Sequence, residues 1–364
     1  MKTKSIDKVF LGIVISLTVI GVFMFISASF GILAKNEAKF YSVLLNQLTF
    51  GLVGGIIMSY VLYRIDYRLL RKYALYIFLA SLMATLLVFV PNLGFRHGGA
   101  LRWLDAGAFS IQPVEFLKIG FVIYFAAWLS LLKNKASDIR YSIIFLLGFL
   151  GIIAVILLKQ PDTKSLILIT VTALSMLFAY GIPWKYILGL FGVICAGFLI
   201  LAMFVPYLND RLYTFIHPSY DISGSSYQLQ QSLIAIGSGG MFGRGFGQSI
   251  QKFSYLPEPQ GDSIFAVIGE EFGFIGGVAL ILLFVAFAMR GLRIASRAPD
   301  LFSRLLVTGI VILFVAQSFL NIASIIGVFP LTGVPLIFIS QGGTSLLFSL
   351  AAIGIVLQIS KQQS

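Results

Sequence analysis

Residues 264–289 read IFAVIGEEFGFIGGVALILLFVAFAM, an apolar run whose only charged residues are Glu270 and Glu271. A helix crosses the hydrocarbon of a bilayer with about 20 apolar residues, so this run is long enough to span one. A strand is excluded because an open sheet leaves backbone groups unpaired in hydrocarbon, and barrel strands alternate apolar with polar residues. The run therefore predicts a transmembrane helix.

Nine more apolar runs lie along the chain. Of its 364 residues, 59% are hydrophobic and 11% are charged, whereas a soluble chain carries about 25% charged residues. The sequence therefore predicts an all-α membrane protein, with one integral membrane domain over residues 1–364 built as a polytopic bundle of about ten transmembrane helices. The other nine predicted helices cover residues 9–30, 44–62, 73–90, 111–132, 141–158, 165–180, 186–205, 305–326 and 344–359.

The lysines and arginines are distributed unevenly between the two sets of connecting segments. Of 26 such residues, 16 fall in the set that includes both termini, 9 fall in the other set, and Lys118 falls inside a run. Because cytoplasmic segments carry the excess of basic residues, both termini are expected in the cytoplasm. Topology and anionic membrane lipid then account for the net charge of +12, and no nucleic-acid partner is needed.

Two extracytoplasmic segments are long enough to carry a site. Residues 206–262 connect the seventh and eighth helices, and residues 91–110 form a second loop. Asp262 ends the larger loop, just before the apolar run. An aspartate there is a favoured helix N-cap, whereas a carboxylate at this boundary could also contact an aqueous sugar and a lipid-borne phosphate. Position alone leaves both roles open.

Charged residues inside the apolar runs are costly in lipid and mark sites or pathways. Glu115 and Lys118 are three residues apart and share a helix face. They form either a structural ion pair or part of a cavity in which Lys118 meets an anionic headgroup. Glu270 and Glu271 lie about 12 Å along their helix and point about 100° apart. At least one of them is therefore expected to face the bundle interior.

Four other stretches have simple structural interpretations beside functional ones. Arg102 with Trp103 is either an interfacial anchor or a phosphate contact. Residues 159–164 are typical of a Pro-Asp turn between two helices. The glycine-rich residues 237–247 form either a mobile turn or a set of backbone N–H groups for a phosphate. Residues 329–345 are expected to form a re-entrant turn packed on protein.

Six motifs occur in order along the chain and cover nearly its whole length. They are Arg102-Trp103; Gln112-Pro113-x-Glu115-x-x-Lys118; Gln160-Pro161-Asp162; Tyr227-Gln228-Leu229-x-Gln231-Ser232; Leu256-Pro257-Glu258-x-x-x-Asp262-x-Ile264-Phe265-Ala266; and Thr332-Gly333-x-Pro335-Leu336 with Ser340-x-Gly342-Gly343-x-Ser345. In this order they resemble the SEDS family (shape, elongation, division and sporulation) of peptidoglycan polymerases. Residues 251–259 resemble the division branch, FtsW, more than the elongation branch, RodA. One departure is Lys164, which stands where the family often has glycine.

The resemblance implies a peptidoglycan glycosyltransferase in the bacterial cytoplasmic membrane, with its active site on the extracytoplasmic side and residues 206–262 as the catalytic loop. It would polymerise lipid II into glycan strands and release undecaprenyl pyrophosphate, in cell division or elongation. The family's essential aspartate maps onto Asp262, as general base or as the holder of a divalent cation such as Mg²⁺ or Mn²⁺. Implied partners are lipid II, nascent lipid-linked glycan and a class B penicillin-binding transpeptidase.

The same motifs supply candidates for substrate binding. Lys118 and Arg102 would contact the pyrophosphate or headgroup, because positive charge there stabilises a leaving phosphate. Glu115 would position Lys118. The remaining candidates are Gln112, Gln228, Gln231, Glu258 and Ser340.

Two other functions remain as alternatives. A lipid II flippase would use Glu115, Lys118, Glu270 and Glu271 as a polar translocation path. A scaffold of the division or elongation complex would carry out no chemistry. Asp262 separates these from a polymerase, which should lose all product without it, whereas a flippase has no evident need for a base in this loop.

Overall fold

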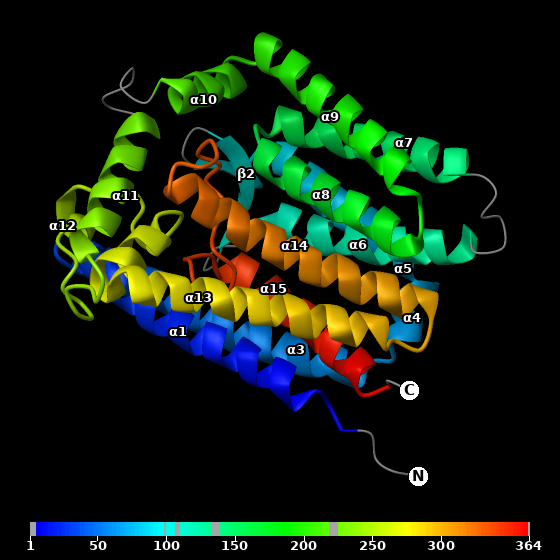
Figure 1. Ribbon diagram of the computed structural model, residues 1–364, viewed down its shortest axis with the longest axis horizontal. Helices are drawn as coiled ribbons and strands as arrows, with labels where there is room; N and C mark the ends of the chain where they lie inside the picture. The colour runs from blue at the N-terminus through cyan, green and yellow to red at the C-terminus, as the bar shows by residue number, and fades with distance from the viewer. Residues whose placement is uncertain (1–4, 98–99, 106–109, 133–138, 218–224, 363–364) are drawn as a thin grey trace.

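The transmembrane helices of the computed structural model lie side by side, with their long axes in similar directions (Figure 1). The structure describes residues 5–97, 100–105, 110–132, 139–217 and 225–362. All ten predicted runs are helical. They correspond to α1 (Lys8–Leu33), the continuous α2 (Glu37–Leu45), η1 (Asn46–Val53) and α3 (Gly54–Arg64), α5 (Ala74–Leu86) with η2 (Leu87–Phe89), α6 (Pro113–Leu131), α7 (Ile139–Lys159), α8 (Thr163–Tyr180), α9 (Trp184–Phe204), α13 (Ile264–Ser296), α14 (Leu301–Ile325) and α15 (Gly343–Ser360).

Eight of these described helices are long and apolar enough to cross a membrane, and the helices at Ala74–Phe89 and Ile143–Lys159 are shorter. The all-α membrane fold is therefore confirmed. The loop after α3 also contains a short helix, α4 (Tyr67–Lys72).

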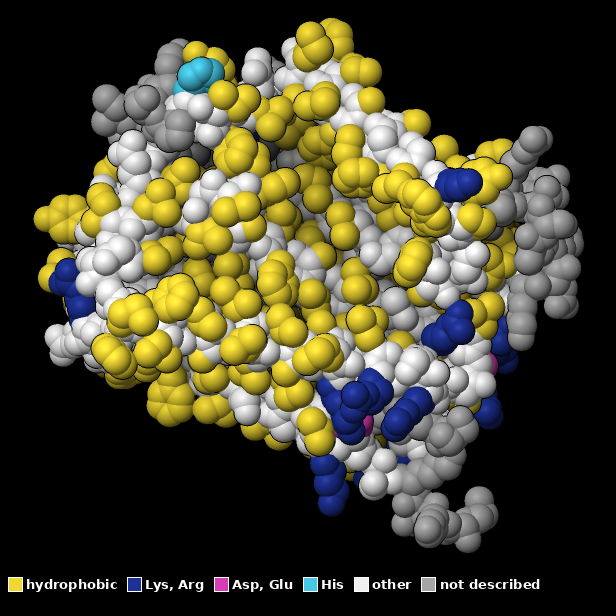
Figure 2. Space-filling view, in the orientation of Figure 1, with side chains coloured by type: hydrophobic (Ala, Val, Ile, Leu, Met, Phe, Trp, Pro, Cys, Tyr) yellow, Lys and Arg dark blue, Asp and Glu magenta, His cyan; other side chains and the backbone are white. Residues whose placement is uncertain are grey.

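Both chain ends lie at the same end of the bundle (Figure 1). The backbone N–H of Asp7 donates to Ser360 Oγ at 3.2 Å, and Arg290 Nε of α13 lies 2.9 Å from the Asp7 carboxylate. The C-terminal parts of α13 and α15 therefore lie at the end of the bundle that holds the termini. Both helices begin at the opposite end, which we term the distal end. On the face in Figure 2, most lysines and arginines gather toward the end with the termini, and hydrophobic side chains cover the middle.

The centre of the bundle is formed by α6, α14 and α15, which bury most of their side chains. Small residues let neighbouring backbones approach closely, as membrane helices require. Gly354 of α15 packs against the backbone of Ser59 in α3, where a Cβ would collide. Helix α9 lies at the periphery, with few buried residues.

The loop at 91–110 contains strands that the sequence analysis did not predict. β1 (Gly94–His97), β2 (Ala100–Asp105) and β3 (Ser110–Ile111) form a small antiparallel sheet in the order β1-β2-β3. They are too short for an alternating pattern to stand out in the sequence. This sheet presents Arg102 and Trp103 from β2 and leads directly into α6.

The large loop at 206–262 contains three helices, α10 (Pro206–Ile216), α11 (Ser225–Gly239) and α12 (Gln251–Ser254). In Figure 1, α11 stands steeply across the direction of α13 and α14. Its contacts with α13 are extensive. The loop is therefore largely structured where it is described, and α11 covers the distal part of the bundle.

The run at 264–289 does not form one uninterrupted helix. Gly273 has φ 66° and ψ −164°, which breaks the helical hydrogen bonding of α13. Residues 240–245 fill the break: the carbonyls of Glu270 and Glu271 accept from the N–H groups of Arg244 and Gly245 at 3.0 and 2.9 Å. In return, Phe274 N–H donates to Gly240 O at 2.9 Å. Pairing of this kind is what a broken helix needs in a membrane, where unpaired backbone is costly.

This pairing bears on the phosphate interpretation of the glycine-rich residues 237–247. The N–H groups of Arg244 and Gly245 are occupied by carbonyls of α13, so these two groups are not free for a phosphate. Gly243, at φ 79°, lies so close to the Glu271 carbonyl that a Cβ would collide. The glycines therefore serve a close approach between two backbones.

Candidate functional site

A cavity of about 330 Å³ opens at the distal end of the bundle. It lies where α6, α8, α13 and α15 begin, and β2 and η1 complete its wall. Several polar side chains line it, so it suits a polar ligand. The lining residues are Val43, Asn46, Gln47, Arg102, Trp103, Ser110, Gln112, Lys164, Glu258, Gly261, Asp262, Gly333, Gln341, Gly342 and Gly343.

Asp262 lies in the turn before α13 and is half-buried. The N-cap of α13 is Ser263, and no side chain caps the helix there, so a capping role for Asp262 is wrong. The backbone carbonyl of Asp262 accepts a hydrogen bond from Asn321 Nδ2 at 2.8 Å. Its carboxylate packs against Gly333, where an added Cβ would lie 2.9 Å from Oδ2. The carboxylate is thus held in place by packing and is left to face the cavity.

The segment 331–335, which contains Gly333, has no helix or strand, yet four of its carbonyls are paired with side chains. Extended backbone at this depth is tolerated only when it is satisfied by protein in this way. The expected packing on protein is therefore confirmed for residues 331–335, and their re-entry into the membrane stays a prediction. Leu331, Gly333, Val334 and Pro335 accept from Arg211, Lys164, Asn321 and Gln317 respectively.

Arg102 reaches the cavity from β2. Its Nε donates to Gln160 O at 3.1 Å and its Nη2 donates to Pro161 O. These two bonds hold the turn between α7 and α8, as expected for a structural Pro-Asp turn. An arginine carries five N–H donors, so Arg102 keeps donors for a ligand. Both interpretations of Arg102 are compatible with this geometry.

Glu115 and Lys118 form a buried ion pair of 2.9 Å on α6. Lys118 Nζ also donates to Gln317 Oε1 at 2.8 Å. Neither side chain lines the cavity. Gln317 Nε2 in turn donates a hydrogen bond to Pro335 O. The ion pair is therefore connected to the segment 331–335 through Gln317. The structure thus presents the structural ion pair, and a headgroup contact of Lys118 stays a prediction.

The other substrate-binding candidates divide into two groups. Gln112 and Glu258 line the cavity with Arg102. Gln228 Nε2 donates to Ser263 Oγ at 3.0 Å, directly beside Asp262, although Gln228 is not a lining residue.

Two candidates lie behind the cavity wall or away from it. Ser340 is buried, donates to Gly261 O and accepts from Leu336 N–H, both at 2.8 Å, so it shapes the wall. Gln231 of α11 is half-buried and is not part of the lining.

The site residues predicted from the sequence left out five polar residues of the cavity lining, namely Asn46, Gln47, Ser110, Lys164 and Gln341. Gln47 of η1 accepts from Gly342 N–H at 2.9 Å and donates to Ser340 O at 3.3 Å. Lys164 is half-buried in the first turn of α8 and donates to Gly333 O. The available signal for Lys164 was its position as a charged residue at the start of an apolar run. Its partner Gly333 is far away in the sequence, so the local pattern could not show that Lys164 lies in the cavity.

Two carboxylates, Glu258 and Asp262, line the cavity. Within the described residues, no group of three His, Cys, Asp or Glu side chains could hold a metal ion. Mg²⁺ is typically bound by one or two carboxylates together with substrate phosphates. The donor set therefore fits a divalent cation that is shared with a bound phosphate.

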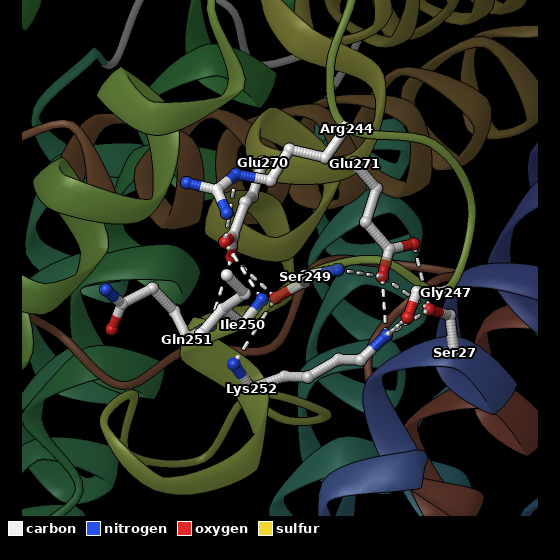
Figure 3. Close-up of polar contacts among 9 residues, drawn as sticks. All are labelled: Ser27, Arg244, Gly247, Ser249, Ile250, Gln251, Lys252, Glu270 and Glu271. Atoms are coloured by element: carbon white, nitrogen blue, oxygen red, sulfur yellow. Dashed lines mark hydrogen bonds and ion pairs between the residues drawn. The ribbon is translucent and has the colours of Figure 1, made fainter.

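Glu270 and Glu271 belong to a second polar centre, which is sealed (Figure 3). Both are buried, and Lys252 Nζ lies 2.7 Å from Glu271 Oε1. Ser27 Oγ of α1 donates to both Glu271 oxygens at 2.7 and 2.8 Å. Glu270 accepts from Ser249 Oγ at 2.5 Å and from Ile250 and Gln251 N–H groups at 2.9 and 3.4 Å. All four carboxylate oxygens are thus occupied, which is unlike an open polar path.

Comparison with known proteins places the chain among bacterial cell-wall proteins. It is 39% identical to the probable peptidoglycan glycosyltransferase FtsW of Trichlorobacter lovleyi, over 97% of this chain and 93% of that protein. It is 36% identical to the stage V sporulation protein E of Bacillus subtilis, over 99% and 98% of the two chains.

Two solved structures have the same fold. A chain from a study of structural coordination of polymerization and crosslinking by a peptidoglycan synthase complex gives a TM-score of 0.78 at 25% identity, over 98% of both chains. The crystal structure of the rod shape determining protein RodA of Thermus thermophilus gives 0.70 at 25% identity, over 98% of this chain and 97% of that chain.

The model of the FtsW, RodA and SpoVE family, described as cell cycle protein, matches residues 7–364. Together with ten apolar helices and motif residues gathered at one cavity, this match confirms the resemblance drawn from the sequence. The chain is a multi-pass membrane protein that belongs to the FtsW/RodA/SpoVE family.

Proposed function

We propose that this protein is a peptidoglycan glycosyltransferase that polymerises lipid II into glycan strands and releases undecaprenyl pyrophosphate. The observation that carries the proposal is the cavity at the distal end, where the Asp262 carboxylate and the cationic side chains of Arg102 and Lys164 line one wall. The names of the relatives, probable peptidoglycan glycosyltransferases, support the same reaction class.

The reaction needs a base and a place for a leaving anion. The sugar 4-hydroxyl of one lipid II attacks the anomeric carbon of the lipid-linked strand, and a new glycosidic C–O bond forms. The bond from that carbon to the pyrophosphate oxygen breaks, and the electron pair leaves with the lipid pyrophosphate. Asp262 takes the hydroxyl proton as general base, and cationic groups stabilise the charge that develops on the leaving oxygen.

A divalent cation fits this cavity as a helper of the leaving group. Asp262 and Glu258 would hold it together with the phosphate oxygens of the substrate. When bound, it would neutralise the pyrophosphate charge. The chain's own residues would still orient the acceptor and receive its proton.

The location of the cavity suits lipid-linked substrates. With both termini in the cytoplasm, the distal end faces the extracytoplasmic side, and the loop at 206–262 covers it. The similarity to a chain of a peptidoglycan synthase complex supports a class B penicillin-binding transpeptidase as partner.

A lipid II flippase is the less favoured alternative. The four charges that it would use lie in closed pairs, since Glu115 pairs with Lys118 and Glu271 with Lys252, while Glu270 is occupied by Ser249 and nearby backbone N–H groups. The carboxylates are thus occupied, and Lys118 spends two of its three N–H donors on Glu115 and Gln317, so these groups offer little to a passing headgroup.

The test is lipid II polymerisation by purified protein, with and without divalent cation. Asp262→Asn should abolish polymer, because the amide cannot take the proton. Asp210→Asn is the matched control, since Asp210 is an exposed aspartate of α10 in the same loop. Undiminished polymer from Asp262→Asn would refute the assignment of the base.

A further inference from the structure

Lys164 is a cation of the cavity for which no specific contact with the substrate has been assigned so far. It stands in the first turn of α8, is half-buried, and lines the cavity with Asp262. Its Nζ donates to Gly333 O. A lysine ammonium has three N–H donors, so two remain for a ligand in the cavity.

Lys164 and Asp262 contact the same glycine. Lys164 holds the Gly333 carbonyl, and the α-carbon side of Gly333 packs against the Asp262 carboxylate. A group bound by the free donors of Lys164 would therefore lie close to the carboxylate. This is the arrangement that a reaction needs when a proton is removed near a departing anion.

The charge balance of the cavity depends on this lysine. Among the described lining residues, the charged side chains are Arg102, Lys164, Glu258 and Asp262, two of each sign. Arg102 already spends two donors on the turn at Gln160 and Pro161. Among these lining side chains, loss of Lys164 would leave one positive and two negative charges, and a net negative charge repels a multiply charged anion. Arg211, which also lies near Gly333, is not a lining residue.

We propose that Lys164 binds the diphosphate of the lipid-linked substrate and is a second cation of its site, in addition to Arg102. This inference rests on the proposed function. An ammonium here supplies charge that would otherwise have to come from a metal ion.

The competing role for Lys164 is purely structural, as a donor that holds the segment 331–335. Two substitutions separate the roles. Lys164→Gln removes the charge but keeps an N–H donor that can reach toward Gly333 O. Lys164→Arg keeps the charge. Lys159→Gln is the matched control, because Lys159 is an exposed lysine at the end of α7 and does not line the cavity.

The experiment measures two quantities on purified protein in lipid nanodiscs. The first is the dissociation constant of inorganic pyrophosphate from calorimetric titration, with and without Mg²⁺. The second is the split of kcat and KM in lipid II polymerisation. A hydrogen bond to a charged group contributes about 1.5–3 kcal/mol, so Lys164→Gln should raise the pyrophosphate dissociation constant and KM by about tenfold or more.

The expected pattern is a large change in binding with a small change in kcat for Lys164→Gln, and near wild-type values for Lys164→Arg and Lys159→Gln. Without Mg²⁺, the binding defect of Lys164→Gln should become larger. Wild-type pyrophosphate affinity in Lys164→Gln, or a fall of kcat at unchanged KM, would overturn the proposal. If wild-type protein makes no polymer but binds pyrophosphate through Lys164, the proposed function fails while the diphosphate site stands.

Discussion

Two acidic centres lie close together in the chain and differ in almost every physical respect. Glu270 and Glu271 are buried among partners that occupy all four oxygens. Asp262, only eight residues earlier, is half-buried, and within the described part of the chain its carboxylate takes no hydrogen bond or ion pair. The cavity beside it keeps free donors on Lys164 and Arg102.

The two centres differ because their charges serve different purposes. A charge in an apolar helix is costly, so it is kept for a reason. At Glu270 and Glu271 the reason is structural: their carboxylates hold Ser27 and residues 249–252 against α13. Their backbone carbonyls pair with the residues that fill the break at Gly273. The Asp262 carboxylate has no hydrogen-bond or ion-pair partner among the described residues, and an unpaired carboxylate that lines a cavity indicates a ligand site.

The largest expected effect comes from removing the unpaired carboxylate. Asp262→Asn should lower polymerisation about 10²–10⁴-fold, the usual contribution of a general base. The unfolding temperature in detergent should stay at the wild-type value, because the carboxylate makes no structural bond among the described residues. A parallel fall of activity and unfolding temperature would make Asp262 a structural residue like Glu271.

The sealed centre should respond in the opposite way. Lys252→Met leaves the buried Glu271 charge without its ion pair, which typically costs about 3–5 kcal/mol of stability. Thermal unfolding of the detergent-solubilised protein should show the loss. The double variant with Glu271→Met should recover most of it, since two apolar side chains replace the pair. A single variant as stable as wild type would show that the centre is not sealed.

A smaller effect should come from the contact between Gly333 and Asp262. Gly333→Ala places a Cβ 2.9 Å from Asp262 Oδ2, and displacement of the base should lower kcat about tenfold or more. Gly240→Ala is the control: its φ of 56° is strained in the same way, but a Cβ there meets nothing within 4 Å. Each alanine should cost about 1–2 kcal/mol from backbone strain, yet only Gly333→Ala should reduce kcat. Equal kcat values in the two variants would contradict the positioning role of Gly333.

The smallest effect should come from the rim of the sealed centre. Arg244 Nε lies 3.7 Å from Glu270 Oε1, and its side chain is 37% exposed. Because solvent screens such a pair, Arg244→Gln should cost no more than about 1 kcal/mol. Chemical unfolding of Arg244→Gln and of Lys252→Met under the same conditions compares their losses of unfolding free energy. A loss as large as that of Lys252→Met would place Arg244 inside the sealed centre.

Much of the fold was predictable because a bilayer leaves few choices. Ten apolar runs became ten helices, with boundaries that differ by a few residues, since apolar length is the dominant requirement for a span. The motif at 256–266, which contains Glu258 and Asp262, together with Arg102 and Gln112, indicated residues that the structure does bring to one cavity.

Other parts could not be predicted from local pattern. Gly273 sits in an apolar run like several other glycines, and only the approach of residues 240–245 makes it a break. Lys118 shares its motif with cavity residues but points to Gln317, because the helix turns it away from the distal opening. The three short strands carry too little pattern to be recognised.

Hydrophobicity and motif order are properties of the chain alone, so the sequence was enough to predict the membrane class, the ten apolar helices, the family and the residue types of the site. Only the tertiary structure decided which charges are sealed and which are open. That distinction depends on partners from distant segments: Ser27 and Lys252 close on Glu271, while Lys164 and Gly333 leave Asp262 facing a cavity. The physical reason is that the cost of a buried charge is set by its surroundings, and those exist only once the chain has folded.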